Sequence, residues 1–258
     1  IGLKKDHRGS VNFTEDSLLT TLTYYHTNNY QIAIHAQGEV AIQQILDAFK
    51  KILKEYPRSN HRHRIEHNAL ITKKQIVQAK NLGITLSFFI DHIYFYGDQL
   101  PNIVGSKRAS RFMPIQSAIS AEHITSIHTD NPATPINPFR ALSTAVTRKT
   151  RETKSILGPD ERVTVYDALK AITINAAWQL FEEDNRGSIT VGKSADLVLL
   201  SHNPLITNVS DIKNIKVIRT WLEGNKVNYS PYTWKNFKLI LRIIFDYIST
   251  SINNWLSI

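Results

Sequence analysis

Short apolar runs alternate with longer segments of helical spacing along the first 148 residues of the chain. The apolar runs are residues 30–36, 62–67, 84–90 and 123–129. The segments whose apolar residues lie three and four positions apart are residues 41–53, 71–79, 115–121 and 139–148. Strands that alternate with helices in this way predict βαβ units and a parallel sheet.

The predicted strands end at polar residues that are capable of chemistry. His35 ends the first strand, His67 ends the second, and Asp130 directly follows the fourth. The third strand contains Ser87, and His92 lies just beyond its end. In a β/α barrel the carboxyl ends of the strands meet at one mouth, where catalytic groups converge. We therefore expect these side chains to share a site.

A different pattern follows Pro138. A long amphipathic helix is predicted over residues 164–180, and glycine punctuation predicts a hairpin over residues 187–193. Further strands are predicted at residues 196–200 and 217–222, with a Gly224-Asn225 turn after the second. These elements predict a small β unit attached to the parallel sheet.

Composition narrows the classes of function. The chain has no cysteine, so any metal must be held by histidine, aspartate or glutamate. The net charge of +9 invites nucleic-acid binding, but the basic residues are dispersed among acids, apart from clusters such as residues 62–64 and 148–149. No aromatic-interleaved basic stripe occurs, so we expect a solvated basic surface and no nucleic-acid partner. The chain has no cysteine, and no leader is visible after Ile1. Both observations fit a cytoplasmic protein, which we expect.

His35, His67 and Asp130 have the residue types that a hydrolytic metal site needs. Such a site holds its ion with a few protein ligands and leaves one position open for water. A nearby carboxylate can take the proton of that water and pass it to a leaving nitrogen. Any one of these residues is weak evidence, because a single histidine is usually a surface or core residue. Three at successive strand ends form a stronger pattern.

Five segments in this order resemble motifs of the amidohydrolase superfamily. The His-Ala-x-Gly-Asp/Glu, Arg-Ile-Glu-His and Asp-x-Pro motifs correspond to residues 34–39, 63–67 and 128–132. Residues 173–177 also match, and residues 187–198 resemble a Gly-Ser-x-x-x-Gly-Lys-x-Ala-Asp-x-Val signature. The similar branch includes the N-substituted formamide deformylases and the YtcJ-like proteins. The resemblance extends from about residue 8 to residue 228.

The resemblance implies an α/β fold, the C-terminal half of a metal-dependent (β/α)8 barrel with a small accessory β-sandwich segment. Residues 1–158 would hold barrel strands five to eight with their helices. Residues 159–228 would hold the final helix and the accessory β unit. Residues 229–258 form an amphipathic tail outside the resemblance, which we expect to cover the barrel. A membrane-surface helix is the alternative for this tail, and its charges argue against a spanning segment.

The resemblance also implies roles for individual residues. His35 and His67 would bind a divalent metal, with zinc as the expected ion. Asp130 would be both a ligand and the general base for the metal-activated water. His92 would contact the substrate or polarise its carbonyl group, although an ordinary loop histidine is an equal interpretation. The expected partner is a small amide-type substrate.

Four neighbouring residues are interpreted structurally. His128 shares the pleat face of Asp130, and we expect it to pack one layer deeper. Glu66 alternates away from His67, which favours a structural pairing with a neighbouring helix. His61 and His63 resemble a metal-binding pair, but they lead into the second strand and are rejected as the ligand pair of the first barrel strand.

The chain also departs from the family pattern. Members open with a His-x-His pair on the first barrel strand, and many carry a lysine on the fourth. Neither is identified here, because the chain would begin around the connection between strands four and five. Lys4 and Lys5 lie near the right region for the lysine, but the residues around them do not match. A half-barrel would expose the edge of its first strand. We therefore expect a fragment, a split-gene product or a decayed copy, completed by a separate N-terminal half or by a homo-oligomer.

Two functions remain after this reasoning. The first is an enzyme that hydrolyses non-peptide carbon–nitrogen bonds, such as those of amides or formamides, with metal-activated water. The second is a non-catalytic protein that keeps the fold and serves in regulation or binding. Metal binding separates the two hypotheses, because only the first requires an ion.

Overall fold

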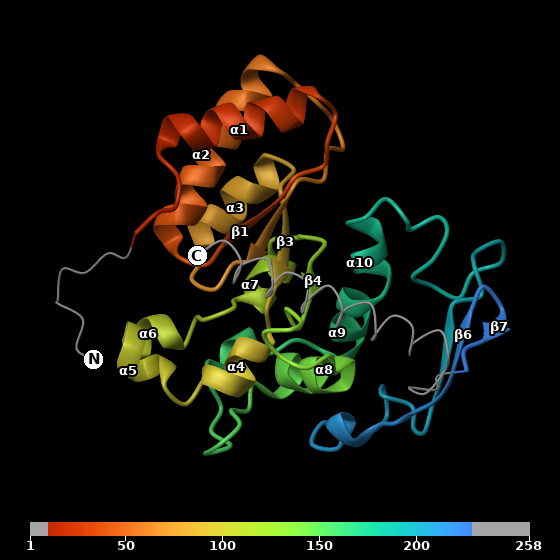
Figure 1. The fold of residues 1–258 in the computed structure, drawn as a ribbon. Helices are drawn as coiled ribbons and strands as arrows, with labels where there is room; N and C mark the ends of the chain where they lie inside the picture. The colour runs from red at the N-terminus through yellow and green to blue at the C-terminus, as the bar shows by residue number, and fades with distance from the viewer. Residues whose placement is uncertain (1–9, 229–258) are drawn as a thin grey trace, which may run out of the picture.

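The computed structural model describes residues 10–228, and its centre is a parallel sheet of four strands (Figure 1). The strands lie side by side in sequence order: β1 (Ala33–Ala36), β2 (Arg64–His67), β3 (Thr85–Phe88) and β4 (Ser126–Ile127). The four predicted strands are confirmed, each shorter than its apolar run. Sequential order and parallel direction are what consecutive β/α units produce.

Helices connect these strands. The predicted ones are confirmed as α2 (Glu39–Glu55), α3 (Lys73–Asn81), α7 (Ile115–Ser120) and α8 (Pro138–Thr147). The apolar stripe of α2 explains its position, since Ile42, Leu46 and Phe49 are fully buried. The stretch expected to be irregular contains three short helices, α4 (Asp91–Tyr96), α5 (Leu100–Val104) and α6 (Ser106–Ala109).

An additional helix, α1 (Glu15–Thr27), packs against α2 and was not expected from the pattern. Its N-terminus is capped by the Thr14 side chain, which accepts from the Ser17 backbone N–H at 3.2 Å. Only Leu18, Leu22 and His26 of this helix are buried. Such a narrow apolar stripe gives little periodic signal in the sequence.

The long helix predicted over residues 164–180 is in fact two helices, α9 (Val165–Ile172) and α10 (Ile174–Trp178). Thr173 breaks them apart with φ −127° and ψ −101°. The break lets α10 bond to the start of β4: Asn175 Nδ2 donates to the Thr125 carbonyl at 3.0 Å. Tertiary hydrogen bonds therefore override the continuous helical periodicity.

A small antiparallel sheet forms the β unit after residue 196, and Figure 1 shows α9 and α10 between it and the parallel sheet. Its strands are β5 (Leu197–Leu200), β6 (Val217–Leu222) and β7 (Asn225–Lys226). Glu223 and Gly224, at φ 51° and 77°, make the tight turn between β6 and β7. Within the described residues this unit is one sheet, whereas a sandwich segment was expected.

The hairpin predicted over residues 187–193 is wrong. Within this segment Ile189 and Val191 are almost wholly exposed, and none of its residues is in a strand. Gly187 lies against α10, where a Cβ would come within 2.9 Å of the Ile174 Cα. The glycines therefore serve a close packing contact and a turn, not a strand pair.

Two arginines of the basic clusters are buried, which corrects the expectation of a solvated surface there. Arg148 is fully buried, and its guanidinium donates to the carbonyls of Phe112 (2.6 Å), Met113 (3.2 Å) and Leu157 (2.5 Å). Burial lowers its pKa to about 10. Arg62 pairs with a carboxylate of residue 183 at 2.6 Å. Both arginines join chain segments that lie far apart in the sequence.

A chain of buried histidines fastens α1 to the amino end of β2. His63 Nδ1 accepts from the Ile32 backbone N–H at 3.0 Å, so the neutral ring carries its proton on Nε2. That Nε2 donates to His26 Nδ1 at 2.9 Å, and His26 Nε2 donates to a carbonyl at the end of α2. His61 is satisfied in the same way, by the His63 backbone N–H and the Leu82 carbonyl. The ring nitrogens of His61 and His63 are thus occupied, in agreement with their rejection as that ligand pair.

Within the part of the chain that the structure describes, no helix has both the length and the apolar content to cross a bilayer. The predicted amphipathic tail, residues 229–258, lies outside the described residues, as do Lys4 and Lys5.

The histidine chain predicts a specific loss of stability in acid. Burial, with the neighbouring His61 and His26 adding to it, lowers the pKa of His63 to about 3. An unfolded histidine titrates at about 6.5, so His63 has no effect above that pH. As the pH falls from about 6.5 towards 3, His63 becomes protonated in the unfolded chain but stays neutral in the folded chain. The free energy of unfolding therefore falls.

Urea unfolding at pH 7.5, 6.0 and 5.0 measures this dependence. In a His63→Phe variant, the free energy of unfolding should depend less on pH between pH 6 and pH 5. The slope should decrease by up to the amount that the uptake of one proton produces. An unchanged slope in the variant would contradict the assignment.

Candidate metal centre

Four histidines and an aspartate gather at the carboxyl edge of the parallel sheet. His35 lies in β1, and His67 ends β2. His92 lies in the first turn of α4, after β3, while His128 and Asp130 follow β4. The register pairs His67 with Ala36 and Phe88 of the neighbouring strands, so the ends of the strands are level. The predicted convergence of these side chains at one edge is therefore observed.

Three of the five form a compact group. His67, His128 and Asp130 each offer a ligand atom, and these atoms all lie within 4.8 Å of one another. His67 and Asp130 have left-handed backbone conformations, with φ 73° and 51°. Non-glycine residues adopt this region rarely, and at a cost, which is typical of functional sites. Two nitrogens and one carboxylate oxygen thus lie close enough together that they could hold one ion.

Several ring nitrogens at this edge are buried without hydrogen-bond partners. They include His67 Nδ1, His128 Nε2 and His92 Nδ1, judged within the described residues. A buried polar atom without a partner costs about 1–3 kcal/mol, so native proteins rarely keep one without a reason. The histidines at the opposite end of β2 have both ring nitrogens satisfied. The orphaned nitrogens therefore fit a role as donors to a bound ion.

Electrostatics keep these imidazoles neutral. Burial is the main cause in each case: it lowers the pKa of His67 and lowers the pKa of His128 and of His92 to about 4. For His128 the Glu66 carboxylate opposes this effect but does not cancel it. A neutral imidazole keeps a free lone pair near pH 7, which a metal requires of its ligand.

His35 lies beside the group but is not part of it. Its ring centroid is 4.3 Å from that of His67, at an interplanar angle of 64°. The side chain is exposed, and its nitrogens are not among the three grouped donors. The structure thus brings together two of the three predicted ligands, His67 and Asp130, and His35 stays a prediction.

His128 is the residue whose place was underestimated from the sequence. Its ring does stack on Phe89, with centroids 5.5 Å apart, as expected of a packing residue. Its Nε2 nevertheless has no hydrogen-bond partner and lies in the compact group with His67 and Asp130. The available signal was the His-x-Asp spacing, which puts two donors on one pleat face.

Glu66 and His92 lie around the group. Glu66 Oε1 accepts from Arg64 Nε at 2.6 Å, so its structural partner is on its own strand and not on a neighbouring helix. Glu66 Oε2 is also 4.0 Å from His128 Nε2. His92 is half-buried, with its ring centroid 4.0 Å from that of Phe89. Its position beside this aromatic ring places it at the edge of the site.

A buried ion pair fixes the loop that carries Asp130. Asp91 is fully buried and accepts from Arg140 Nη2 at 2.7 Å and from Arg140 Nε at 3.3 Å. The Thr134 hydroxyl lies 3.2 Å from the same carboxylate, and Arg140 also donates to the Pro135 carbonyl at 2.5 Å. The pair therefore connects α4, which carries His92, to the segment after Asp130 and to α8.

Removing one partner of this pair should be strongly destabilising. An Asp91→Leu variant leaves the Arg140 guanidinium without its carboxylate, at an expected cost of about 3 kcal/mol in the free energy of unfolding. The matched control is the double variant Asp91→Leu/Arg140→Met, which should recover part of that loss in urea unfolding. Equal stability of the single variant and the unaltered chain would show that the pair does not hold the loop.

The three-donor group predicts a hierarchy of zinc affinity. A His67→Ala or His128→Ala change should weaken zinc binding by more than about a hundredfold. Even the loss of a residue that only hydrogen-bonds to a metal ligand lowers metal affinity by about 10–100-fold. His202→Ala, at an exposed histidine outside the site, is the matched control and should bind zinc unchanged. Competition titration with a chromophoric chelator measures the zinc affinity of all three variants. Equal affinity in the His128 variant and the control would remove His128 from the ligand set.

Residues 3–228 match the model of a protein family described as the amidohydrolase family. The chain is 31% identical over 198 residues to Protein LONG AFTER FAR-RED 3 of Arabidopsis thaliana, covering 76% of this chain and 34% of that protein. It is 29% identical over 194 residues to an N-substituted formamide deformylase of Arthrobacter pascens, covering 75% and 35%. The second match confirms the branch expected from the motifs.

The fold is also similar to that of a solved metal-dependent hydrolase. An uncharacterized metal-dependent hydrolase from Pyrococcus furiosus superimposes with a TM-score of 0.64 at 26% identity, covering 77% of this chain and 39% of that chain. The chain spans about a third of the length of the Arabidopsis thaliana and Arthrobacter pascens relatives.

Proposed function

Because this chain belongs to the amidohydrolase family, we propose that it forms the later half of a metal-dependent (β/α)8 hydrolase that cleaves non-peptide carbon–nitrogen bonds. The observation that carries the proposal is the group of His67, His128 and Asp130, whose buried ring nitrogens lack partners. Amides and formamides are the substrate class, supported by the similarity to an N-substituted formamide deformylase.

The donor set fits a zinc-like ion. His67 and His128 offer neutral nitrogens and Asp130 a carboxylate oxygen, the ligand types of catalytic zinc sites with three protein ligands. His35, next to His67, remains the proposed further ligand. When bound, a divalent ion supplies Lewis-acid activation of water and of the substrate carbonyl.

Asp130 and His92 carry the proton transfers and the orientation of the substrate. The Asp130 carboxylate is exposed at the mouth, where it accepts the proton of the attacking water and delivers it to the leaving nitrogen. His92 is neutral near pH 7, so its ring donates one hydrogen bond, which orients the substrate carbonyl. The Asp91–Arg140 pair joins α4, which carries His92, to the segment after Asp130.

A non-catalytic regulatory or binding protein is the second candidate. One observation favours it: the described residues group only three donors, and His35 is not among them. Such a protein would keep the sheet and its buried core without a functional need for the ion. An absence of zinc binding, or zinc binding without hydrolysis, would support this alternative.

A hydrolysis assay on the zinc-loaded chain tests the proposal. We expect slow release of amine from simple N-substituted formamides, and a decrease of at least about a hundredfold in kcat for Asp130→Asn, because a general base contributes 10²–10⁴-fold. Glu182→Gln, a carboxylate change outside the site, is the control and should leave the rate unaltered. If the zinc-loaded chain releases no amine above background, or if Asp130→Asn keeps full activity, the proposed reaction is wrong.

A further inference from the structure

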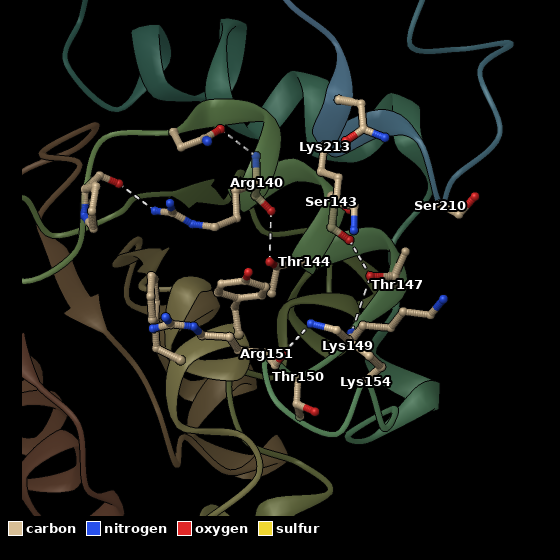
Figure 2. Close-up of a pocket in the computed structure, with 15 residues that line it drawn as sticks. Arg140, Ser143, Thr144, Thr147, Lys149, Thr150, Arg151, Lys154, Ser210 and Lys213 are labelled. Atoms are coloured by element: carbon tan, nitrogen blue, oxygen red, sulfur yellow. Dashed lines mark hydrogen bonds between the residues drawn. The ribbon is translucent and has the colours of Figure 1, made fainter.

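A cavity of about 680 Å³ lies beside α8 (Figure 2). Its fifteen lining residues come from α4, from the segment before α8, from α8, from residues 149–154 and from residues 210–214. None of them is a candidate metal ligand. The volume lies in the range of small-molecule sites.

The charge of the lining is of one sign. Its charged members are Arg140, Lys149, Arg151, Lys154 and Lys213, and no aspartate or glutamate lines the cavity. Arg140 is neutralised by the buried Asp91, and the Lys154 ammonium donates to the carbonyl of residue 151. Lys149, Arg151 and Lys213 form no ion pair within the described residues. Three unpaired cations thus border one hollow.

Aromatic contacts hold two of these side chains in place. The guanidinium carbons of Arg140 and Arg151 lie 5.0 Å and 5.6 Å from the ring centroid of Phe95. Such cation–π contacts restrict a guanidinium without using its hydrogen-bond donors. Arg151 is therefore oriented, and its donors remain available for an anion.

Lys213 is brought to the same cavity by the accessory unit. It lies in η2 (Ile212–Asn214), a short helix that packs against α8. The Ile212 side chain is fully buried there and anchors the helix. The cavity thus lies at the junction of the two parts of the fold, and cations from both parts face it.

We propose that this cavity binds a small, multiply charged oxyanion of the phosphate-ester or diphosphate class. Three unpaired cations with no carboxylate among the lining residues repel one another, and an oxyanion would relieve that repulsion while accepting charge-assisted hydrogen bonds. Arginine and lysine together are the usual ligands of phosphate groups. This proposal does not rest on the hydrolytic function, because the lining shares no residue with the metal centre.

Calorimetric titration of the full chain with inorganic pyrophosphate, in metal-free buffer at about 0.1 M ionic strength, tests the proposal. We expect saturable binding at one site per chain, weakened at least about tenfold in Lys149→Gln/Arg151→Gln, because each charged hydrogen bond is worth about that factor. Lys213→Gln alone should weaken it in the same direction. Sulfate at equal ionic strength should compete only weakly.

The matched control is Lys73→Gln/Lys74→Gln, which removes the same charge from exposed positions of α3. Equal weakening by the two double variants would show a general effect of the net charge of +9 and overturn the site. Absence of saturable binding would overturn it as well. A His67→Ala variant should bind pyrophosphate unchanged, which keeps this result independent of the metal centre.

Discussion

The parallel register of β1 to β4 is the constraint on which the candidate site depends. It sets the carboxyl ends of four strands level, so that donors separated by more than sixty residues, His67 and Asp130, come within 4.8 Å. The buried apolar face of α2 and the fully buried Leu86 and Phe88 hold this sheet together. A shift of register by one residue would turn every side chain to the opposite face and disperse the group.

The histidines at the two ends of the sheet differ in the hydrogen bonding of their ring nitrogens. At the amino end, His26, His61 and His63 exchange hydrogen bonds with one another and with backbone groups until every ring nitrogen has a partner. At the carboxyl end, burial also keeps the imidazoles of His67 and His128 neutral, yet His67 Nδ1 and His128 Nε2 stay without partners. Hydrogen bonding therefore separates the structural histidines from the proposed ligands.

Much of this arrangement could be predicted from the sequence, because strand runs and helical spacing are local signals. The four strands, the helices between them and the convergence of His67 and Asp130 follow from those signals. The break at Thr173, the buried Arg148 and the unpaired nitrogen of His128 do not. Each depends on hydrogen bonds, or on their absence, between segments far apart in the chain, which periodicity cannot show.

We propose that His67, His128 and Asp130 share one ion. A crystal structure of the zinc-soaked chain, with anomalous data at the zinc edge, tests it most directly. We expect one strong peak bonded to a nitrogen of His67, a nitrogen of His128 and an oxygen of Asp130, at roughly 2.0–2.2 Å. A peak on the His61 and His63 rings instead, or none at the carboxyl edge of the sheet, would contradict it.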